Sequence, residues 1–183
     1  MRLRHIAPAG TPIGLRDFGG WMASIGSRDR VLDEFSGALR AAFGVRHCFF
    51  ASTGRAALTV ILQALRQRSG DGRNEVVVPS YTCYSVPASV MRAGLKVRIS
   101  DVDPRTLDYD YGKLDQLDTD NVLALVSSNL YGIPNDLVRL SAYAKKREIS
   151  LIDDAAQCMG GMVNGKYAGT YGTAGLFSLD KGK

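Results

Sequence analysis

Apolar residues along the chain recur either at helical spacing or in short continuous runs. Helical spacing predicts four helices, over residues 28–43, 53–68 and 84–94 and from Asn135 or Asp136 to Arg147. The first of these ends at Gly44, a residue that readily adopts the backbone conformation found just after a helix. Pro87 lies in the expected first turn of the third helix, where its missing N–H costs nothing.

Short apolar runs predict the strands. They lie at residues 47–52, 75–80, 96–100, 122–128, 149–153 and 174–179. The run VLALVSS at 122–128 has the continuous apolar character of a strand covered on both faces. Because strands alternate with helices, the pattern predicts an α/β fold, a three-layer α/β/α arrangement around a mostly parallel sheet. Ligands of such sheets bind beyond the carboxyl ends of the strands.

Composition narrows the class of protein. The 183 residues suit one domain, and the net charge of +5 comes from scattered basic residues without the basic stripe that nucleic acid requires. No apolar stretch approaches the roughly 20 residues that span a bilayer, and the N-terminus lacks the apolar segment of a signal peptide. Cys48, Cys83 and Cys158 are too widely spaced to indicate a disulfide framework or a zinc site. We therefore expect a cytoplasmic protein without a metal, a membrane or a nucleic-acid partner.

The segment ASTGRAAL at 51–58 joins a predicted strand to a predicted helix. Gly54 is expected to let the backbone turn closely, and the amides of Gly54, Arg55 and Ala56 to open the helix. Free N–H groups at the positive end of a helix form a phosphate site. A plain turn with an N-cap is the alternative, because the segment is neither a Walker loop nor a GxGxxG motif.

The segment LIDDAAQ at 151–157 places two acids at the end of a strand. They could bind magnesium, or lie solvated in a loop. They could also supply the carboxylate that pairs with the protonated ring nitrogen of pyridoxal phosphate. Asp154 suits this last role, because the two alanines that follow it leave room for a flat ring.

The segment GLFSLDKGK at 175–183 brings Ser178 and, five residues later, Lys183 to the end of the last strand. A lysine that bonds to the aldehyde carbon of pyridoxal phosphate needs a nearby hydroxyl to hold the phosphate. Lys181 competes for this role on sequence alone, and both lysines could simply be solvated.

Six segments together resemble the DegT/StrS sugar aminotransferases, which are fold-type-I enzymes that depend on pyridoxal 5′-phosphate. In chain order these are STGRAAL, VVVPSYT, DVDPRTLDYD, LYGIPND, DDAAQ and GLFSLDKGK. The resemblance extends from about residue 11 to the end of the chain, and DDAAQ and FSLDKGK are its most specific parts.

The resemblance implies a role for each matched residue. Lys183 is the catalytic lysine that binds the cofactor, with Lys181 a neighbour, and Asp154 pairs with the ring nitrogen. The remaining cofactor contacts that it implies are Gln157 at the ring's oxygen side, Ser178 at the phosphate, and Gly54, Arg55 and Ala56 in the phosphate loop. Two positions depart from the family: Arg55 replaces a threonine or serine, and Cys83 replaces the aromatic residue that stacks on the cofactor. Either Tyr84 substitutes for that aromatic, or the stacking contact is lost.

The implied activity is transamination of a keto group on a nucleotide-linked sugar, with an amino acid, expected to be glutamate, as donor. Such reactions serve amino-sugar and cell-surface polysaccharide biosynthesis. The family forms homodimers in which the partner completes each site. We expect an N-terminal arm at 1–27 and part of the cofactor-binding large domain at 28–183. We expect the family's small C-terminal domain to be absent from these residues.

Two alternatives remain open from the sequence. The chain could be a truncated, non-catalytic relative that binds the cofactor weakly or acts through protein contacts, and we expect these 183 residues alone to be inactive. It could also be a sugar dehydratase on the same scaffold. The dehydratases have a histidine in place of the lysine, so Lys183 argues against that reading.

Overall fold

The computed structural model describes residues 14–70 and 72–179, which divide into two compact units. The first unit, through Phe50, contains α1 (Leu15–Ala23) and α2 (Arg28–Phe43). Helix α2 has the predicted bounds, and Gly44 after it has a φ of 64°. Helix α1 falls within the expected arm and was not predicted. Its first turn is capped by Asp17, whose carboxylate accepts the Gly14 N–H at 2.8 Å.

The strand expected at 47–52 does not form. Residues 47–51 have no regular secondary structure, although they are apolar enough for a strand. A strand is stable only when its backbone groups pair with a neighbouring strand. Here the Cys48 carbonyl accepts a side-chain hydrogen bond from Ser36 at 3.4 Å, and Phe49 is 88% exposed. The prediction was wrong because apolar character alone supplies no partner.

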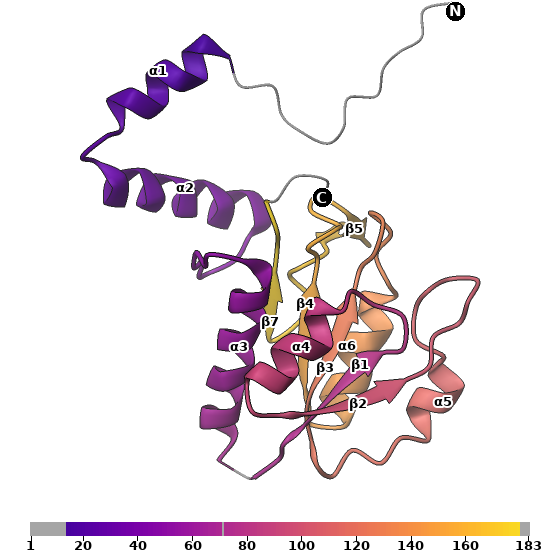
Figure 1. The fold of residues 1–183 in the computed structure, drawn as a ribbon. Helices are drawn as coiled ribbons and strands as arrows, with labels where there is room; N and C mark the ends of the chain where they lie inside the picture. The colour runs from indigo at the N-terminus through magenta and orange to yellow at the C-terminus, as the bar shows by residue number, and fades with distance from the viewer. Residues whose placement is uncertain (1–13, 71, 180–183) are drawn as a thin grey trace, which may run out of the picture. The chain divides into compact units, whose positions relative to one another are not determined.

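The second unit, Ala51–Ser178, is built on a sheet of five strands that run parallel (Figure 1). The strands are β1 (Glu75–Pro79), β2 (Lys96–Ser100), β3 (Val122–Ser128), β4 (Ser150–Asp154) and β7 (Ala174–Leu176). Their order across the sheet is β2-β1-β3-β4-β7. The parallel sheet is therefore confirmed, although the last strand stops at Leu176 and not at residue 179.

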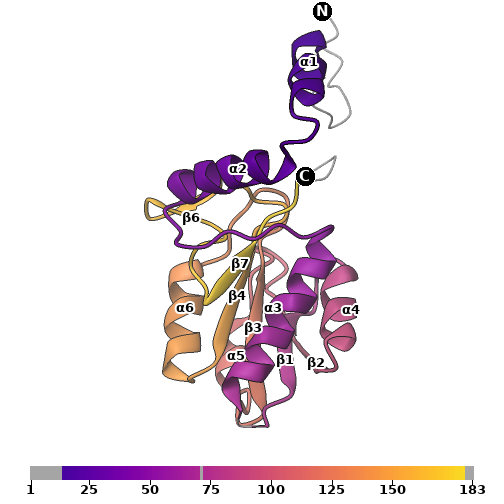
Figure 2. The same cartoon turned by 90° about the vertical axis from the view of Figure 1, so that its left-hand side faces the viewer.

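Helices cover both faces of this sheet, which confirms the three-layer prediction (Figure 2). On one face α3 (Gly54–Ser69) and α4 (Ser85–Arg92) pack over alternate residues of the strands, such as Val126 and Ile152. On the other face α6 (Leu137–Lys146) and the short α5 (Tyr111–Asp115) pack over the remaining set, such as Leu125 and Leu151. Successive strand residues point to opposite faces, and the strands are apolar at successive positions. Both cores are therefore apolar.

Three short elements were not predicted: α5 and a small antiparallel hairpin of β5 (Met162–Val163) and β6 (Lys166–Tyr167). They are too short for hydrophobic periodicity to register. The hairpin nevertheless carries a turn signal. Asn164 and Gly165 both have positive φ, at 47° and 77°, as the Asn-Gly pair of a type I′ turn requires.

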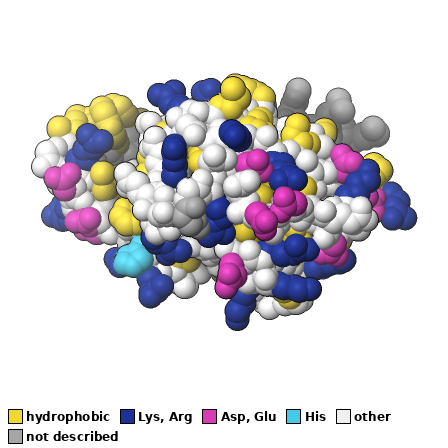
Figure 3. Space-filling model, turned by 90° about the horizontal axis from the view of Figure 1, so that it is seen from below, with side chains coloured by type: hydrophobic (Ala, Val, Ile, Leu, Met, Phe, Trp, Pro, Cys, Tyr) yellow, Lys and Arg dark blue, Asp and Glu magenta, His cyan; other side chains and the backbone are white. Residues whose placement is uncertain are grey.

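Acidic and basic side chains are interspersed on the face shown in Figure 3. No helix within residues 14–70 and 72–179 is both long and apolar enough to cross a membrane. The same residues contain no group of three His, Cys, Asp or Glu placed to hold a metal ion, and their three cysteines are not in disulfides.

Candidate active site at the carboxyl ends of the strands

The two acids at the end of β4 point to opposite faces of the sheet. Asp154 shares its face with Ile152, which packs in the core beneath α3 and α4. Its register partners are Ser128 on β3 and Leu176 on β7, and paired residues of parallel strands point the same way. Asp154 is half-buried, and its Oδ1 accepts the Ala156 N–H at 3.0 Å. The structure thus directs Asp154 toward the face where α3 begins.

Asp153 lies on the α6 face and is fully buried. Its Oδ2 accepts the N–H groups of Gly169 at 2.7 Å and Tyr171 at 3.1 Å, and its Oδ1 accepts Asn129 Nδ2 at 2.8 Å. Burial raises the pKa of Asp153 above its ordinary value, against the lowering effect of these donors and of Lys166. These bonds tie the loop before β7 and the residue after β3 to the end of β4.

The start of α3 faces the same side of the sheet as Asp154. Thr53 is its N-cap, and Thr53 Oγ1 accepts the Ala56 N–H at 3.1 Å. The N–H groups of Gly54 and Arg55 have no partner within the described residues. The sixteen-residue helix adds the positive end of its dipole at this point. Two amide donors are therefore presented to any anion bound there.

Gly54 is not required by the backbone. Its φ is not positive, and a Cβ there would make only an ordinary contact, 3.9 Å from Leu176 Cδ1. The expectation that this glycine allows a close turn is wrong, because the turn tolerates a side chain. Arg55 is exposed, and its guanidinium pairs with no acid among the described residues.

Ser178 follows β7 on the chain. Leu176 packs in the core beneath α3, whereas Phe177 packs on the other side, in a cluster with Leu137 and Ala155. Continued alternation places half-buried Ser178 on the α3 face with Asp154. Lys181 and Lys183 lie outside the described residues.

Gln157 lies three residues beyond Asp154 and belongs to a chain of hydrogen bonds that the sequence did not reveal. Its Oε1 accepts the Tyr131 N–H at 3.2 Å, and its carbonyl accepts the Gly132 N–H at 2.8 Å. The Tyr131 hydroxyl lies 2.7 Å from that of Tyr81, which follows β1. The ends of β1, β3 and β4 are thereby connected at this edge of the sheet.

The segment after β1 holds the two residues considered for stacking. Cys83 is half-buried and accepts a hydrogen bond from Ser85 Oγ at 3.1 Å, while Tyr84 caps α4 and is 73% exposed. Both lie at the start of the helix that neighbours α3, on the Asp154 side of the sheet. Next to them, Thr82 Oγ1 lies 2.8 Å from Ser128 Oγ.

Sequence reasoning therefore missed Tyr81, Thr82, Ser128, Asn129 and Tyr131. A signal was available, because each of them ends a predicted strand or lies within three residues after one. Polar residues at the carboxyl ends of neighbouring parallel strands meet at one edge of the sheet. The sequence did not give the strand order, and that order decides which strand ends are neighbours.

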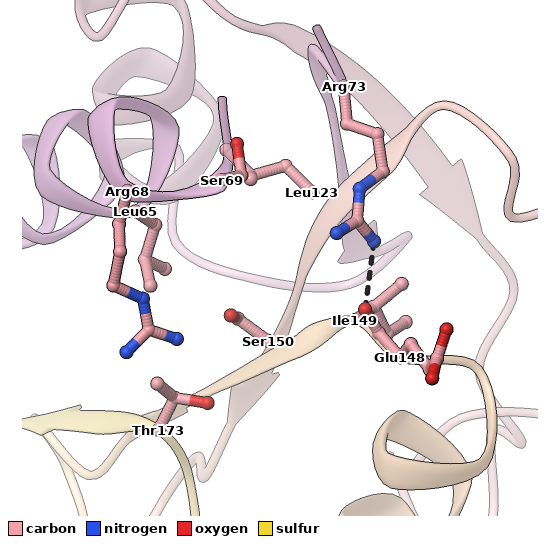
Figure 4. A pocket seen from close by; sticks show the side chains of 9 residues that line it. All are labelled: Leu65, Arg68, Ser69, Arg73, Leu123, Glu148, Ile149, Ser150 and Thr173. Carbon is pink, nitrogen blue, oxygen red and sulfur yellow. Dashed lines mark hydrogen bonds between the residues drawn. The ribbon is translucent and has the colours of Figure 1, made fainter. Parts of the chain in front are cut away.

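Two cavities lie elsewhere in the second unit. One, of about 310 Å³, is lined by the amino ends of β3 and β4 and by Arg68 and Arg73 (Figure 4). There Arg73 Nη1 donates to the Glu148 carbonyl at 2.8 Å. The other, of about 1050 Å³, lies between residues 103–112 and 133–139. Neither is lined by Asp154, Ser178 or the start of α3, so neither contains the residues predicted to hold the cofactor.

Comparison with known proteins decides the family. Residues 18–183 match the family model described as the DegT/DnrJ/EryC1/StrS aminotransferase family. The chain belongs to the DegT/DnrJ/EryC1/StrS aminotransferase family. The predicted resemblance is thus confirmed over nearly the whole chain.

Individual members of this DegT family are similar to the chain over part of their length. It is 33% identical over 142 residues to GDP-4-keto-6-deoxy-D-mannose 3-dehydratase of Yersinia pseudotuberculosis, covering 74% of this chain and 35% of the relative. It is 34% identical over 159 residues to GDP-perosamine synthase of Caulobacter vibrioides. That match covers 87% of this chain and 41% of the relative. The chain therefore spans less than half of the length of these relatives.

A solved structure shows the same fold. The Escherichia coli GDP-4-keto-6-deoxy-D-mannose-3-dehydratase with bound hydrated PLP matches with a TM-score of 0.84 at 24% identity. The match covers 95% of this chain and 46% of that one. The chain therefore has the same fold as the matched half of that protein.

Proposed function

We propose that the protein is a pyridoxal 5′-phosphate-dependent aminotransferase that acts on a keto sugar attached to a nucleotide. The observation that supports the proposal is that groups from separate segments of the chain meet at one edge of the sheet. Asp154 and the start of α3 lie on the same face at the carboxyl edge of the sheet, and we infer from continued strand alternation that Ser178 lies there too. These are the groups that a phosphate and a pyridinium nitrogen require, and they occur in a chain of the DegT family.

The residues fit this cofactor on chemical grounds. Within the described residues the Gly54 and Arg55 amides donate to no protein acceptor, as a phosphate site needs. Asp154 is half-buried and is followed by Ala155 and Ala156, so a flat ring meets no large side chain from these two residues. The fully buried Asp153 is on the wrong face to take the same role.

The chain's own residues would divide the work as follows. When bound, pyridoxal 5′-phosphate supplies an electron sink for transfer of an amino group. Asp154 would hold the proton on the ring nitrogen, and the α3 amides with Ser178 Oγ would anchor the phosphate. Lys183 would use Nζ to hold the cofactor and then to move a proton to and from the substrate carbon. Tyr84 or Cys83 would cover one face of the ring.

The substrate and the setting are proposals that rest on the relatives. GDP-perosamine synthase and GDP-4-keto-6-deoxy-D-mannose 3-dehydratase are named for sugars linked to a nucleotide, which supports a substrate of that class. We propose glutamate as the amino donor, amino-sugar and cell-surface polysaccharide biosynthesis as the pathway, and a cytoplasmic homodimer as the working form. The domain roles of residues 1–27 and 28–183 are proposed on the same basis.

Covalent labelling tests the proposal. The protein is incubated with pyridoxal 5′-phosphate, reduced with borohydride, digested and mapped by mass spectrometry. We expect the pyridoxyl group on Lys183. Labelling of Lys181 would contradict the assignment of the lysine, and a protein without any label would support the non-catalytic alternative.

A second candidate function is dehydration of a keto sugar, because one of the similar relatives is a 3-dehydratase. Lys183 argues against it, because the dehydratases on this scaffold have a histidine in place of the lysine. Analysis of the product separates the two candidates. Incubation with glutamate and a keto-sugar nucleotide should yield an amino sugar, and a deoxy sugar without nitrogen would favour the dehydratase.

A further inference from the structure

The turn that follows β3 has an unusual backbone. The Ile133 N–H bonds to the Leu130 carbonyl at 2.9 Å, and the two residues between them have positive φ, 57° for Tyr131 and 77° for Gly132. Glycine adopts this region without steric conflict, whereas a tyrosine does so only when its contacts hold it there. The contacts of Tyr131 therefore show what holds the turn in this conformation.

The main chain of this turn binds the segment after β4. Asn129 N–H donates to the Asp154 carbonyl at 3.0 Å, and Gly132 N–H donates to the Gln157 carbonyl at 2.8 Å. Between them, Tyr131 N–H donates to the side chain of Gln157, at Oε1. Three donors thus hold residues 154–157 against the turn, and one of them acts on a side chain that the cofactor would meet.

The Tyr131 side chain fixes the turn from the other direction. Its hydroxyl lies 2.7 Å from the Tyr81 hydroxyl, and the two tyrosines are 50 residues apart in the sequence. Their side chains are 64% and 46% exposed, so burial does not account for either residue. Glycine at position 131 would adopt the positive φ without strain, but it would lose the hydrogen bond between the two hydroxyls.

These bonds determine which way the Gln157 amide faces. A backbone N–H can only donate, so the atom that it meets must be the amide oxygen. The amide nitrogen then points away from Tyr131, and it has no hydrogen bond to the described residues. At the carboxyl edge of the sheet, Gln157 therefore has an N–H donor that makes no hydrogen bond within the described residues.

We propose that Tyr131, held by Tyr81, is a positioning residue that orients the Gln157 amide as a donor to the phenolic oxygen of pyridoxal 5′-phosphate. This inference rests on the proposed function. A donor at that oxygen favours its anionic form, so it lowers the pKa of the bound chromophore. The absorption spectrum of the bound cofactor, titrated with pH, therefore reports on the orientation directly.

The test compares Tyr81→Phe, Tyr131→Phe and the double variant in protein loaded with pyridoxal 5′-phosphate. Each single change removes the same bond and leaves the backbone donor in place. We expect each to raise the chromophore pKa by about half a unit, equivalent to roughly a threefold change in the equilibrium, and the double variant to add nothing further. Gln157→Glu keeps the acceptor for Tyr131 but loses the donor, and should raise the chromophore pKa by about one unit or more.

A matched control separates this role from general support of the fold. Tyr143→Phe removes a phenol bond to the Leu114 carbonyl, 2.9 Å long, on the α6 side of the sheet. It should lower the melting temperature and leave the chromophore pKa unchanged. In cofactor-free protein, amide hydrogen exchange at residues 130–133 should be faster in Tyr81→Phe and unchanged in Tyr143→Phe.

The outcomes are distinct. If the wild type binds pyridoxal 5′-phosphate and neither phenylalanine variant shifts the chromophore pKa, this inference is overturned while the proposed function stands. Unequal, additive shifts would also overturn it, because they would show that the tyrosines act separately. A wild type that binds no pyridoxal 5′-phosphate would overturn the proposed function and this inference with it.

Discussion

Asp153 and Asp154 are neighbours in the chain, yet they have different environments. Successive side chains of a strand point to opposite faces, so β4 buries Asp153 on the α6 side and directs Asp154 to the α3 side. Asp153 accepts three hydrogen bonds, from two backbone N–H groups and Asn129. At the scale of single residues, the first acid therefore supports the fold, whereas the second faces the side of the sheet on which α3 begins.

Substitution of each acid in a complete enzyme should separate these roles. Asp154→Asn is expected to lower kcat by about 10²-fold or more with the fold intact, because it removes the charge that stabilises a protonated ring nitrogen. Asp153→Asn is expected to lower the free energy of unfolding by about 1–3 kcal/mol, because its new NH₂ faces the Asn129 donor. Urea unfolding and kcat, expressed per folded molecule, measure both. A larger loss of kcat in Asp153→Asn would reverse the assignment.

The raised pKa of Asp153 predicts a pH dependence of stability. Because burial raises its pKa in the folded state above the ordinary 3.8, the folded state binds this proton more tightly than the unfolded state. The stabilising contribution is complete below 3.8 and is lost as the pH rises through the folded pKa of Asp153.

The difference in the free energy of unfolding between wild type and Asp153→Asn isolates this contribution. It should therefore shrink as the pH is raised from about 3.8 toward neutrality. Urea unfolding at several pH values measures it, and a difference that grows with pH would show that the hydrogen bonds outweigh burial.

At the scale of elements, the end of α6 shows how one helix is joined to the next strand. The Glu148 N–H bonds to the Lys145 carbonyl at 3.3 Å and the Ile149 N–H to the Ala144 carbonyl at 3.0 Å, the pattern of a Schellman motif. The motif requires positive φ at Glu148, which has 54°. Arg73 Nη1 then donates to the Glu148 carbonyl at 2.8 Å. Glycine is the usual residue at this position, so Glu148 carries backbone strain.

Glu148→Gly should relieve that strain. We expect the free energy of unfolding to rise by about 1 kcal/mol, because glycine adopts positive φ without a steric penalty. Glu148→Ala is the matched control: it removes the same charge but keeps a Cβ, and should give no stabilisation. Equal stabilisation by both variants would mean that the charge, and not the backbone, is responsible.

At the scale of the whole molecule, the sheet has a free edge. β7 pairs with β4 on one side and has only three residues, and no strand among the described residues lies on its other side. The residues of the first unit that were expected to form a strand remain unpaired. An uncovered edge exposes backbone donors and acceptors, which favours association with other chains.

Residues 1–183 produced by themselves are expected to give no turnover, because this edge is open and the chain spans less than half of its relatives' length. The assay combines the purified chain with pyridoxal 5′-phosphate, glutamate and a panel of keto-sugar nucleotides. Amino-sugar formation and light scattering are followed together, with GDP-perosamine synthase as the positive control. Turnover by a monodisperse preparation would contradict the prediction and show that these residues form a working enzyme.

The sequence by itself determined the alternation of helices and strands and the position of the chemical groups at the strand ends. Both are local properties: periodicity shows which residues face a core, and Gly44 or the Asp136 cap shows where a helix ends or begins. The segments around Gly54, Asp154 and Ser178 could be found in this way, and so could the family. The residues at 47–52 show the limit, because their pattern was that of a strand and no neighbouring strand was there to pair with them.

Only the tertiary structure decided which strand ends are neighbours. The order β2-β1-β3-β4-β7 and its register arise from contacts between residues far apart in the chain, which no local pattern encodes. That order places Tyr81 against Tyr131 and Tyr131 against Gln157, and directs Asp154 rather than Asp153 toward α3. Strand pairing is set by backbone hydrogen bonds and by burial of both faces together, so the face of each acid and the partners of Gln157 become known only when the sheet is assembled.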